Sequence, residues 1–407
     1  MKRRLFTKLE KFITDKDIRT CILTGPPFVG KTYLATDLFR SYSTDYLYLD
    51  VRFDKNLNGF INSEKEKKHG KSINLSELLC AYFRINFETL KNIPIILDEP
   101  YSNNELMAAL SEYVRTFTSD KSLRLFIING CYSHKVTDIF KTCPNMLHAE
   151  LGAFSFDEFL MACDHEWYAE VMEGQFAKKK RLPEMLHNEL SSLFDIYLSI
   201  GGMPSAILEY LNYEGPVNTD NINQNLRLLT GLRYEDKSLE KILLSVESSL
   251  NSTSSKYTYS SIHRGATAGQ YGESINIFTD DGMLTRTDSF SDEVNPSVKS
   301  SFRLYSNIYT RDASHRFISY AAWRLHTRHN EIFFYETAGR AYIDFLFRNE
   351  NSDNIPVVIK HQGKSRDRAL SSYLSNHNTK YSVVISENNL DFQNNILKIP
   401  FYCTHLL

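Results

Sequence analysis

The sequence predicts an α/β protein in which the first 160 residues form a parallel β-sheet with helices on its faces. Three observations support this fold class: short apolar runs alternate with helical patterns, a glycine-bounded loop follows the first run, and two acidic residues end the third. The apolar runs, each predicted to be a strand, are Ile18–Thr24, Tyr46–Val51, Pro94–Leu97, Leu123–Ile128 and Leu147–Leu151. Asn56–Lys71, between the second and third runs, is rich in Lys, Glu and Asn and is predicted as a surface loop.

Length and charge set limits on the whole chain. Its 407 residues correspond to two or three domains at roughly 150 residues per domain. The 47 Lys and Arg against 49 Asp and Glu leave a net charge of −2, which excludes a protein whose whole surface binds nucleic acid but leaves room for a local basic patch. Hydrophobic residues make up 42%, so sizeable cores can form and global disorder is excluded.

Cysteine spacing and the N-terminus predict a soluble, cytoplasmic protein with no membrane partner. The six cysteines are scattered without a CxxC pair, which in a chain of this length indicates reduced thiols. The stretch Leu5–Thr14 is interrupted by Lys8, Glu10 and Lys11, so it is not the apolar core of a signal peptide. No window of the sequence approaches the roughly 18 uncharged apolar residues that a membrane span needs.

Changes in pattern divide the chain into three predicted domains. The pattern becomes helical from Phe156 to about Leu250, Ser252–Ser261 is rich in Ser, Thr and Tyr, and the last part of the chain contains short strand-like runs. Residues 1–160 would form the first domain, 161–290 a helical domain, and 291–407 a second α/β domain.

The loop after the first strand fits the pattern G-x-x-x-x-G-K-[ST], and it lies between a strand and a helix as that pattern requires. In such a loop, backbone N–H groups and the helix N-terminus surround phosphate groups. Lys31 would contact the β- and γ-phosphates, and the Thr32 hydroxyl would bind Mg²⁺. The alternative, an ordinary glycine-bounded turn, requires strand, octet and helix to coincide by chance. The predicted nucleotide-binding residues are Gly25, Pro26, Pro27, Phe28, Val29, Gly30, Lys31, Thr32 and Tyr33.

Two adjacent carboxylates, Asp98 and Glu99, end the third strand. Asp98 would hold Mg²⁺ through water together with Thr32, and Glu99 would be the general base that activates the attacking water. An acidic cap at a strand end is the alternative, but the Lys31 loop makes turnover of ATP or GTP the natural chemistry. Asn129 ends the next strand and would orient that water, although a plain turn residue fits this position nearly as well.

Several segments, in this order along the chain, resemble one known family. They are GPPFVGKT, IILDEP, FIINGC, ELGAFSFDEFL, YLSIGGMP, FFYETAGRAYIDFLF and VVIK. Together they resemble the prokaryotic AAA-type ATPases of the archaeal ATPase-like group, which carry a C-terminal domain related to PD-(D/E)XK nucleases. The resemblance covers nearly the whole chain, and the ELGAFSFDEFL and YLSIGGMP segments are more specific than the loop, which all P-loop proteins share.

The resemblance implies an AAA-type P-loop sheet with Asn129 as a sensor residue, and it favours ATP over GTP. It also implies a helical lid as far as about residue 250 and a winged helix near 255–290, with helices at Tyr259–Ala266 and Tyr271–Thr279. Winged helices often bind DNA, but the candidate recognition helix is poor in cations, so a protein partner fits equally well. Self-association into a homo-oligomer is a further expectation.

Two departures from the family pattern bear on activity. Thr142–Met146 contains no arginine, where the family places one suited to sensing the γ-phosphate, and this favours slow hydrolysis. In the last domain, Asp344 and Lys360 fit nuclease positions, but Val358 stands where a second carboxylate is needed. The sequence therefore predicts a degenerate restriction-endonuclease-like α/β domain that binds or scaffolds, and it disfavours nuclease activity.

The predicted function is Mg²⁺-dependent ATP hydrolysis coupled to a conformational switch that acts on a protein or DNA partner. Two alternatives stay open: a nucleotide-gated binding or scaffold module with negligible turnover, and an ATP-dependent DNA nuclease. The missing arginine motivates the first alternative, and the nuclease-like positions motivate the second.

Overall fold

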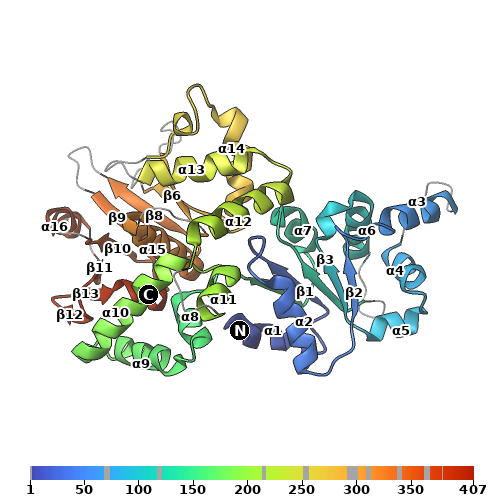
Figure 1. Cartoon of the computed structure of the whole chain (residues 1–407), viewed down its shortest axis with the longest axis horizontal. Coiled ribbons are helices and arrows are strands. Elements are labelled where there is room, and N and C mark those ends of the chain that lie inside the picture. The colour runs from blue at the N-terminus through green and yellow to red at the C-terminus, as the bar shows by residue number, and fades with distance from the viewer. Residues whose placement is uncertain are drawn as a thin grey trace. The chain divides into compact units, whose positions relative to one another are not determined.

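A computed structural model of the chain describes residues 2–67, 74–116, 122–212, 217–250, 256–290, 301–308, 313–336, 342–361, 367–377 and 379–407. These residues form two compact units (Figure 1). The N-terminal unit contains Lys2–Gly152 together with Asp280–Gly282, and the C-terminal unit contains Ala153–Thr279 and Met283–Leu407. The division into domains 1–160, 161–290 and 291–407 stays a prediction.

A five-stranded sheet forms the centre of the N-terminal unit, in the order β2-β3-β4-β1-β5. Its strands are β1 (Thr20–Thr24), β2 (Leu47–Asp50), β3 (Ile95–Asp98), β4 (Leu125–Ile128) and β5 (Met146–Glu150). All pairings between neighbouring strands are parallel, and every residue of β1, β3 and β4 is buried. The predicted parallel α/β fold of this region is therefore confirmed.

Helices pack on both faces of this sheet (Figure 1). They are α1 (Leu5–Thr14), α2 (Lys31–Ser41), α3 (Leu57–Lys67), α4 (Leu75–Phe83), α5 (Phe87–Asn92), the 3-10 helix η1 (Pro100–Ser102), α6 (Asn104–Arg115) and α7 (Ser133–Phe140). On one face, the rings of Phe12 and Phe39 lie edge-on to Phe126 of β4, with centroids 5.4 and 5.7 Å away. The next residue, Ile127, points to the opposite face and joins the core that contains Leu110 of α6.

Helix α3 corrects one expectation, because the predicted surface loop Asn56–Lys71 contains this helix as far as Lys67. Leu57 and Ile61 lie one turn apart and are each 1% exposed in the core of the unit. An apolar pair at this spacing is enough to bury one side of a helix. Lys and Glu residues outnumber this apolar pair in the segment, so the composition does not reveal it. Residues 68–71 lie outside the described part of the chain.

The first part of the C-terminal unit is helical, as predicted. Its helices are α8 (Phe156–Ala162), α9 (Glu166–Ala177), α10 (Glu184–Ile200), α11 (Pro204–Asn212), α12 (Thr219–Tyr234), α13 (Ser238–Leu250), the 3-10 helix η3 (Tyr259–Ser261) and α14 (Ala268–Asp280). Further along the chain are α15 (Ala313–His329), α16 (Asp367–Asn376) and the 3-10 helix η4 (Phe401–Leu406).

Two of the segments that carry the family resemblance, ELGAFSFDEFL and YLSIGGMP, contact each other in this unit. Ser155 and Glu158 form a capping box that starts α8, and α10 ends at Gly201, whose φ is 80°. The amide of Phe154 donates a hydrogen bond of 2.7 Å to the carbonyl oxygen of Gly202. A Cβ at Gly202 would lie 2.4 Å from Phe154 O, so only glycine allows this close approach of the two backbones.

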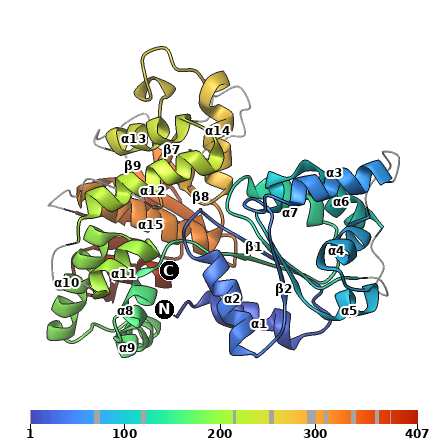
Figure 2. The same cartoon turned by 45° about the vertical axis from the view of Figure 1, so that its right-hand side comes forward.

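An eight-stranded mixed sheet completes the C-terminal unit, in the order β12-β13-β11-β10-β9-β8-β6-β7. The strands are β6 (Leu284–Ser289), β7 (Phe302–Ser306), β8 (Ile332–Glu336), β9 (Tyr342–Arg348), β10 (Asn354–Ile359), β11 (Ser382–Ser386), β12 (Asp391–Gln393) and β13 (Ile396–Pro400). β6 pairs antiparallel with β7 and parallel with β8, so one sheet continues across the predicted boundary at residue 290. Helix α13 contacts β7 at the edge of this sheet (Figure 2).

The two helices predicted for a winged helix have different outcomes. Tyr271–Thr279 is helical and lies within α14, whereas Tyr259–Ala266 contains only the single 3-10 turn η3. Ser261 Oγ donates to the carbonyl oxygen of Thr258 at 2.6 Å, and such local side-chain bonds compete with a regular helix. Gly265, with a φ of 90°, lies outside the helical region of the backbone. The winged helix itself stays a prediction.

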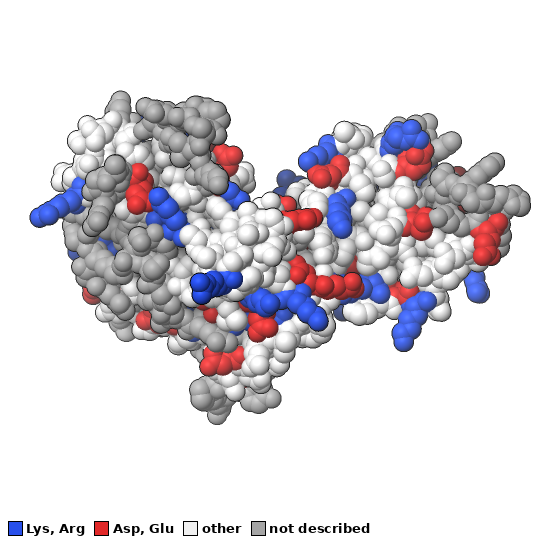
Figure 3. Space-filling view, turned by 90° about the horizontal axis from the view of Figure 1, so that it is seen from above, with Lys and Arg blue, Asp and Glu red and all other residues white. Residues whose placement is uncertain are grey.

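The surface is mixed in charge. Figure 3 shows Lys and Arg interspersed with Asp and Glu on the described parts of both units that face the viewer. This distribution agrees with the net charge of −2. Within the residues that the structure describes, no helix combines the length and the apolar character needed to cross a membrane.

Candidate functional site

The loop between β1 and α2 has the backbone that a phosphate-binding loop requires. Gly25 and Gly30 have φ angles of 133° and 92°, a region that residues with a Cβ rarely adopt. Gly25 is also constrained by space, because a Cβ there would lie 2.0 Å from the carbonyl oxygen of Leu151. Gly30 is the N-cap of α2. The N–H groups of the first helical turn, which have no partner within a helix, therefore begin where the loop ends and can bind an anion.

Lys31, the first residue of α2, folds back over this loop. Its side chain is 5% exposed, and Nζ donates hydrogen bonds to the carbonyl oxygens of Gly25 at 2.9 Å and Pro26 at 2.7 Å. Phosphate oxygens are charged and accept stronger hydrogen bonds from an ammonium group than neutral carbonyls do. Lys31 is thus held within the loop by bonds that a phosphate group can replace.

Thr32 and Asp98, predicted as the magnesium ligands, are in direct contact. Thr32 Oγ1 donates a hydrogen bond of 2.6 Å to Asp98 Oδ2, and the Tyr48 hydroxyl donates to the same oxygen at 2.9 Å. Burial raises the pKa of the Asp98 carboxyl, and the hydrogen bonds from Thr32 and Tyr48 oppose this rise. The pair of adjacent oxygen donors fits Mg²⁺, which takes oxygen ligands from one or two protein groups and completes its shell with phosphates and water.

Within the described ranges, no larger metal site competes with Thr32 and Asp98. Among the residues that the structure describes, no group of three or more His, Cys, Asp or Glu side chains is placed to hold a metal ion. Mg²⁺ bound together with phosphates needs no such group.

Glu99, predicted as the general base, leaves β3 in a left-handed backbone conformation with a φ of 56°. Such a conformation is costly for a residue other than glycine and is typical of functional sites. The side chain is 5% exposed, and Oε2 accepts a hydrogen bond of 3.1 Å from the Gly130 amide. A Cβ on Gly130 would lie 2.6 Å from Glu99 Oε1 and 2.9 Å from Lys31 Nζ. Gly130 therefore borders both charged groups.

Asn129, predicted to orient water, is fully buried at the end of β4. Its side-chain Nδ2 donates to the carbonyl oxygen of Cys131 at 2.7 Å. Within the described part of the chain, Asn129 Oδ1 has no hydrogen-bond partner. A buried acceptor without a partner costs about 1–3 kcal/mol, and a water molecule in the site would remove this cost. The Asn129 side chain therefore holds the loop through Nδ2, and its Oδ1 is an acceptor suited to a water molecule.

Tyr33, another of the predicted binding residues, lies at the surface. It lies in the first turn of α2 and is 57% exposed. An exposed aromatic ring beside the loop has a face on which a base can stack. Its contact with a nucleotide stays a prediction, as do the contacts predicted for Pro27, Phe28 and Val29.

The lysines near the missing arginine are engaged on the surface. Lys141 Nζ lies 2.7 Å from Asp138 Oδ1 one turn earlier. Lys135 Nζ lies 4.3 Å from the centre of the Tyr132 ring. Neither contact presents a bidentate cation of the kind that an arginine supplies.

The nuclease-like positions do not form a metal site in the described residues. Asp344 on β9 is fully buried, and its Oδ2 accepts a hydrogen bond of 2.8 Å from the amide of Ile359 on β10. Val358 is fully buried on β10, and the Lys360 amide donates to Ile385 O at 2.8 Å. The Asp344 carboxylate thus ties two neighbouring strands together, and the nuclease-like type of this region stays a prediction.

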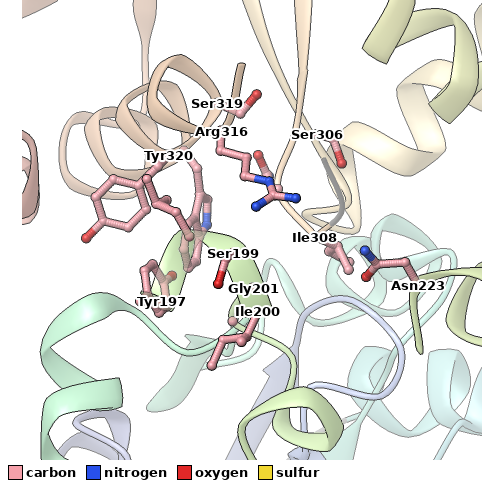
Figure 4. Close-up of a pocket in the computed structure, with 14 residues that line it drawn as sticks. Tyr197, Ser199, Ile200, Gly201, Asn223, Ser306, Ile308, Arg316, Ser319 and Tyr320 are labelled. Atoms are coloured by element: carbon pink, nitrogen blue, oxygen red, sulfur yellow. The ribbon is translucent and has the colours of Figure 1, made fainter. Parts of the chain in front are cut away.

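A separate pocket lies within the C-terminal unit and was not predicted. It is formed by the end of α10 with Gly201 and Gly202, by the residues that end β7, and by one side of α15. Figure 4 shows the Arg316 side chain extending from α15 toward Ile308, with Asn223 nearby. Among its described residues, the lining contains a cation, hydroxyls and aromatic rings but no carboxylate.

Sequence reasoning missed two residues of the main site. Tyr48 lies on β2, which neighbours β3 with Asp50 opposite Asp98, and its hydroxyl reaches the Asp98 carboxylate. Gly130 directly follows the predicted sensor residue, and a glycine at that position is the signal that could have identified it.

Comparison with known proteins found similar structures but no similar sequence family. The sequence matches no protein-family model, and a search of curated proteins found no match. The chain is similar in structure to the Walker-type ATPase of Pyrococcus abyssi, with a TM-score of 0.44 and 14% identity over 74% of this chain and 92% of that one.

Two further solved structures are similar at lower TM-scores. One is the Aeropyrum pernix Orc1 protein in complex with DNA, with a TM-score of 0.31 and 12% identity over 78% of this chain and 90% of that one. The other is the RuvB Holliday junction branch migration motor of Thermotoga maritima, with a TM-score of 0.35 and 13% identity over 70% of this chain and 90% of that one. At these values the function has to be argued from the residues of this chain.

Proposed function

We propose that this chain is an ATP-binding P-loop ATPase that hydrolyses ATP with Mg²⁺. One observation supports this most directly: Thr32 Oγ1 in the phosphate loop lies 2.6 Å from Asp98 Oδ2 at the end of β3, although the two residues are 66 positions apart. Their sequence neighbours Lys31 and Glu99 both border Gly130. A cation for phosphate, oxygen ligands for a metal and a buried carboxylate base therefore belong to one site.

The phosphate groups would be bound by the loop and the start of α2. The N–H groups of the loop and of the first helical turn bind negative charge, and Lys31 adds a buried positive charge. The Thr32 hydroxyl and the Asp98 carboxylate would hold Mg²⁺, which offsets the charge that develops on the phosphate oxygens. Tyr48 would keep the Asp98 carboxylate oriented through its hydrogen bond of 2.9 Å.

Glu99 would take the proton from the attacking water. The Gly130 amide binds Oε2 and thereby fixes the orientation of the carboxylate, which is what an efficient general base requires. Asn129 Oδ1 would accept a second hydrogen bond from the same water. General-base catalysis of this kind contributes about 10²- to 10⁴-fold to a rate.

The energy of hydrolysis would drive a conformational switch that acts on a protein or DNA partner. The winged-helix-like region is the proposed contact, and its candidate recognition helix within α14 contains Gln270, Glu273 and Ser274 but no Lys or Arg. A helix without cations contributes little phosphate binding, so a protein partner is as well supported as DNA. Self-association into a homo-oligomer is proposed on the sequence resemblance alone.

A second function is supported by one specific feature, the absence of arginine in Thr142–Met146. Without a bidentate cation at the γ-phosphate, transition-state charge is less well stabilised. Arginines of this kind raise the rate of hydrolysis about 10³- to 10⁵-fold in other P-loop enzymes. The chain would then act as a nucleotide-gated binding or scaffold module with negligible turnover. An ATP-dependent DNA nuclease is the least supported alternative, because Val358 occupies a ligand position.

Two substitutions test the proposal. Lys31→Ala removes the cation of the loop and is expected to abolish binding of Mg·ATP, measured by isothermal titration. Glu99→Gln keeps the size of the side chain and one acceptor for the Gly130 amide, so the protein should still bind Mg·ATP but release phosphate about 10²- to 10⁴-fold more slowly. A folded wild-type protein that binds no nucleotide would refute the proposed function. Binding without turnover would favour the nucleotide-gated module.

A further inference from the structure

The short segment Asp280–Gly282 joins α14 to β6 in the chain, but it packs with the N-terminal unit. At its centre, Asp281 is fully buried. Its Oδ2 accepts a hydrogen bond of 2.7 Å from the Tyr132 amide, and its Oδ1 accepts one of 2.6 Å from the Ser133 amide. Both oxygens of one buried carboxylate are therefore bound to consecutive backbone N–H groups.

These N–H groups lie where the loop after β4 becomes helix α7. Tyr132 is the N-cap of α7, has a φ of 52°, and provides no side-chain cap for the helix. Such a helix start leaves N–H groups that need acceptors. Asp281 supplies them from 149 positions away, and a carboxylate bound to backbone N–H groups forms bonds about twice as strong as neutral ones.

The same loop contains Asn129 and binds Glu99, the two residues that act on water in the proposed reaction. It begins at Asn129, whose side chain binds Cys131 O. Its next residue, Gly130, donates the amide hydrogen bond to Glu99 Oε2. The loop is thus fixed at its start by β4 and at its end by Asp281, with the partner of Glu99 in between.

The turn that carries Asp281 also fits closely against the phosphate loop. Gly282 has a φ of 75°, and a Cβ there would lie 2.9 Å from Glu150 Oε1 and 3.3 Å from Pro26 Cδ. Only glycine fits both the backbone conformation and the space. The turn therefore borders two elements of the candidate site, the phosphate loop and the loop after β4.

We propose that Asp281 is a positioning residue for ATP hydrolysis, which holds the loop after β4 so that the Gly130 amide keeps Glu99 in place. The inference rests on the proposed function and extends it to a residue outside the nucleotide-binding motifs. Asp281 acts through Glu99, so its loss affects the chemical step, whereas the phosphate loop retains its capacity to bind nucleotide.

The test compares Asp281→Asn with Asp280→Asn in the full-length protein. The control removes the same charge from the neighbouring residue, whose side chain is 54% exposed and lies 4.0 Å from His134. For Asp281→Asn, the Kd for Mg·ATP should be unchanged, and the single-turnover rate should fall by about 10- to 100-fold, as expected when a catalytic group is displaced by a fraction of an ångström to about 1 Å. The control should behave as wild type.

A double-mutant cycle separates positioning from a general loss of structure. If Asp281 acts through Glu99, adding Asp281→Asn to Glu99→Gln should cause no further loss of rate, because residues in one network are not additive. Asp281→Glu, which keeps the negative charge but displaces the carboxylate, should show the same selective loss of rate and is the variant to use if Asp281→Asn does not fold. An Asp281→Asn rate equal to wild type, a loss additive with Glu99→Gln, or a parallel loss of nucleotide binding would overturn the inference. A wild-type protein that binds no Mg·ATP would instead refute the proposed function, and the inference with it.

Discussion

Replacing Gly130 by alanine tests whether Lys31 and Glu99 act from the positions that they occupy in the structure. A Cβ at residue 130 would lie 2.6 Å from Glu99 Oε1 and 2.9 Å from Lys31 Nζ. The φ of Gly130 is not in the left-handed region, so the backbone itself accepts alanine. Both neighbours are ends of flexible side chains, which can move aside. The protein should therefore fold, with its two charged groups displaced.

The size of the effect follows from these distances. Ordinary contacts between non-bonded heavy atoms are about 3.5 Å, so each group must move by roughly half an ångström or more. A misplacement of 1 Å costs about 100-fold in rate, and we expect Gly130→Ala to lower the single-turnover rate of ATP hydrolysis by about 10- to 100-fold. By transition-state arithmetic this is about 1.4–2.7 kcal/mol of barrier.

Rapid-quench measurement of phosphate release from Mg·ATP bound to excess enzyme provides the assay. Gly174→Ala is a matched control, because Gly174 lies in α9 and a Cβ there would meet nothing within 4 Å. That control should hydrolyse at the wild-type rate and be slightly more stable, since alanine favours a helix over glycine by about 1 kcal/mol. A Gly130→Ala protein with the wild-type rate would show that Glu99 and Lys31 do not act from these positions.

Three further predictions concern other parts of the chain. Tyr48→Phe removes a hydrogen bond to Asp98 and should weaken the apparent affinity for Mg²⁺ about 10-fold, measured by titrating the metal at saturating ATP; unchanged metal dependence would exclude Tyr48 from the site. Burial raises the pKa of Asp98, so the folded protein binds this proton more tightly than the unfolded chain, and the free energy of unfolding should fall as pH rises from the unfolded pKa to the raised folded one. Urea unfolding of nucleotide-free wild type and Asp98→Asn over that pH range should show that the free energy of unfolding falls less steeply with pH in the variant. The same dependence on pH in both proteins would contradict the raised pKa of Asp98. Gly202→Ala places a Cβ 2.4 Å from Phe154 O and should lower the free energy of unfolding by about 1–3 kcal/mol, whereas an unchanged midpoint would show that the two backbones are not tightly packed.

The core of the candidate site could be predicted because short contiguous patterns encode it. A strand, a glycine-bounded loop and a helix follow one another directly, and the acidic pair ends an apolar strand. In a parallel sheet these strand ends meet at one edge, so the approach of Thr32 to Asp98 follows from the topology. The sheet that brings them together was predicted for the same reason.

The residues that support the site have no such local pattern. Tyr48 reaches Asp98 because β2 neighbours β3, which the sequence alone does not specify. Asp281 reaches the loop after β4 from a segment 149 positions away. Neither contact belongs to a motif, so both depend on a tertiary arrangement that composition and periodicity do not encode.

Two local predictions were wrong, one from composition and one from the family resemblance. Asn56–Lys71 is polar enough to be predicted as a loop, yet Leu57 and Ile61 bury one side of α3. Tyr259–Ala266 was predicted as a helix, but it contains only one 3-10 turn, in which Ser261 binds the local backbone at Thr258 O. In both cases one pair of residues, Leu57 with Ile61 and Ser261 with Thr258, decides the local structure. A residue pattern averaged over a longer segment does not detect such a pair.

The most direct test of the central claim is hydrolysis of a stoichiometric amount of Mg·ATP by wild-type protein and by Glu99→Gln. The account predicts that both proteins bind the nucleotide with similar Kd, that wild type converts it to ADP and phosphate in a single turnover, and that Glu99→Gln still holds intact ATP after the same time. Equal phosphate release by the two proteins would contradict the assignment of Glu99 as the base in a site shared with Lys31, Thr32 and Asp98.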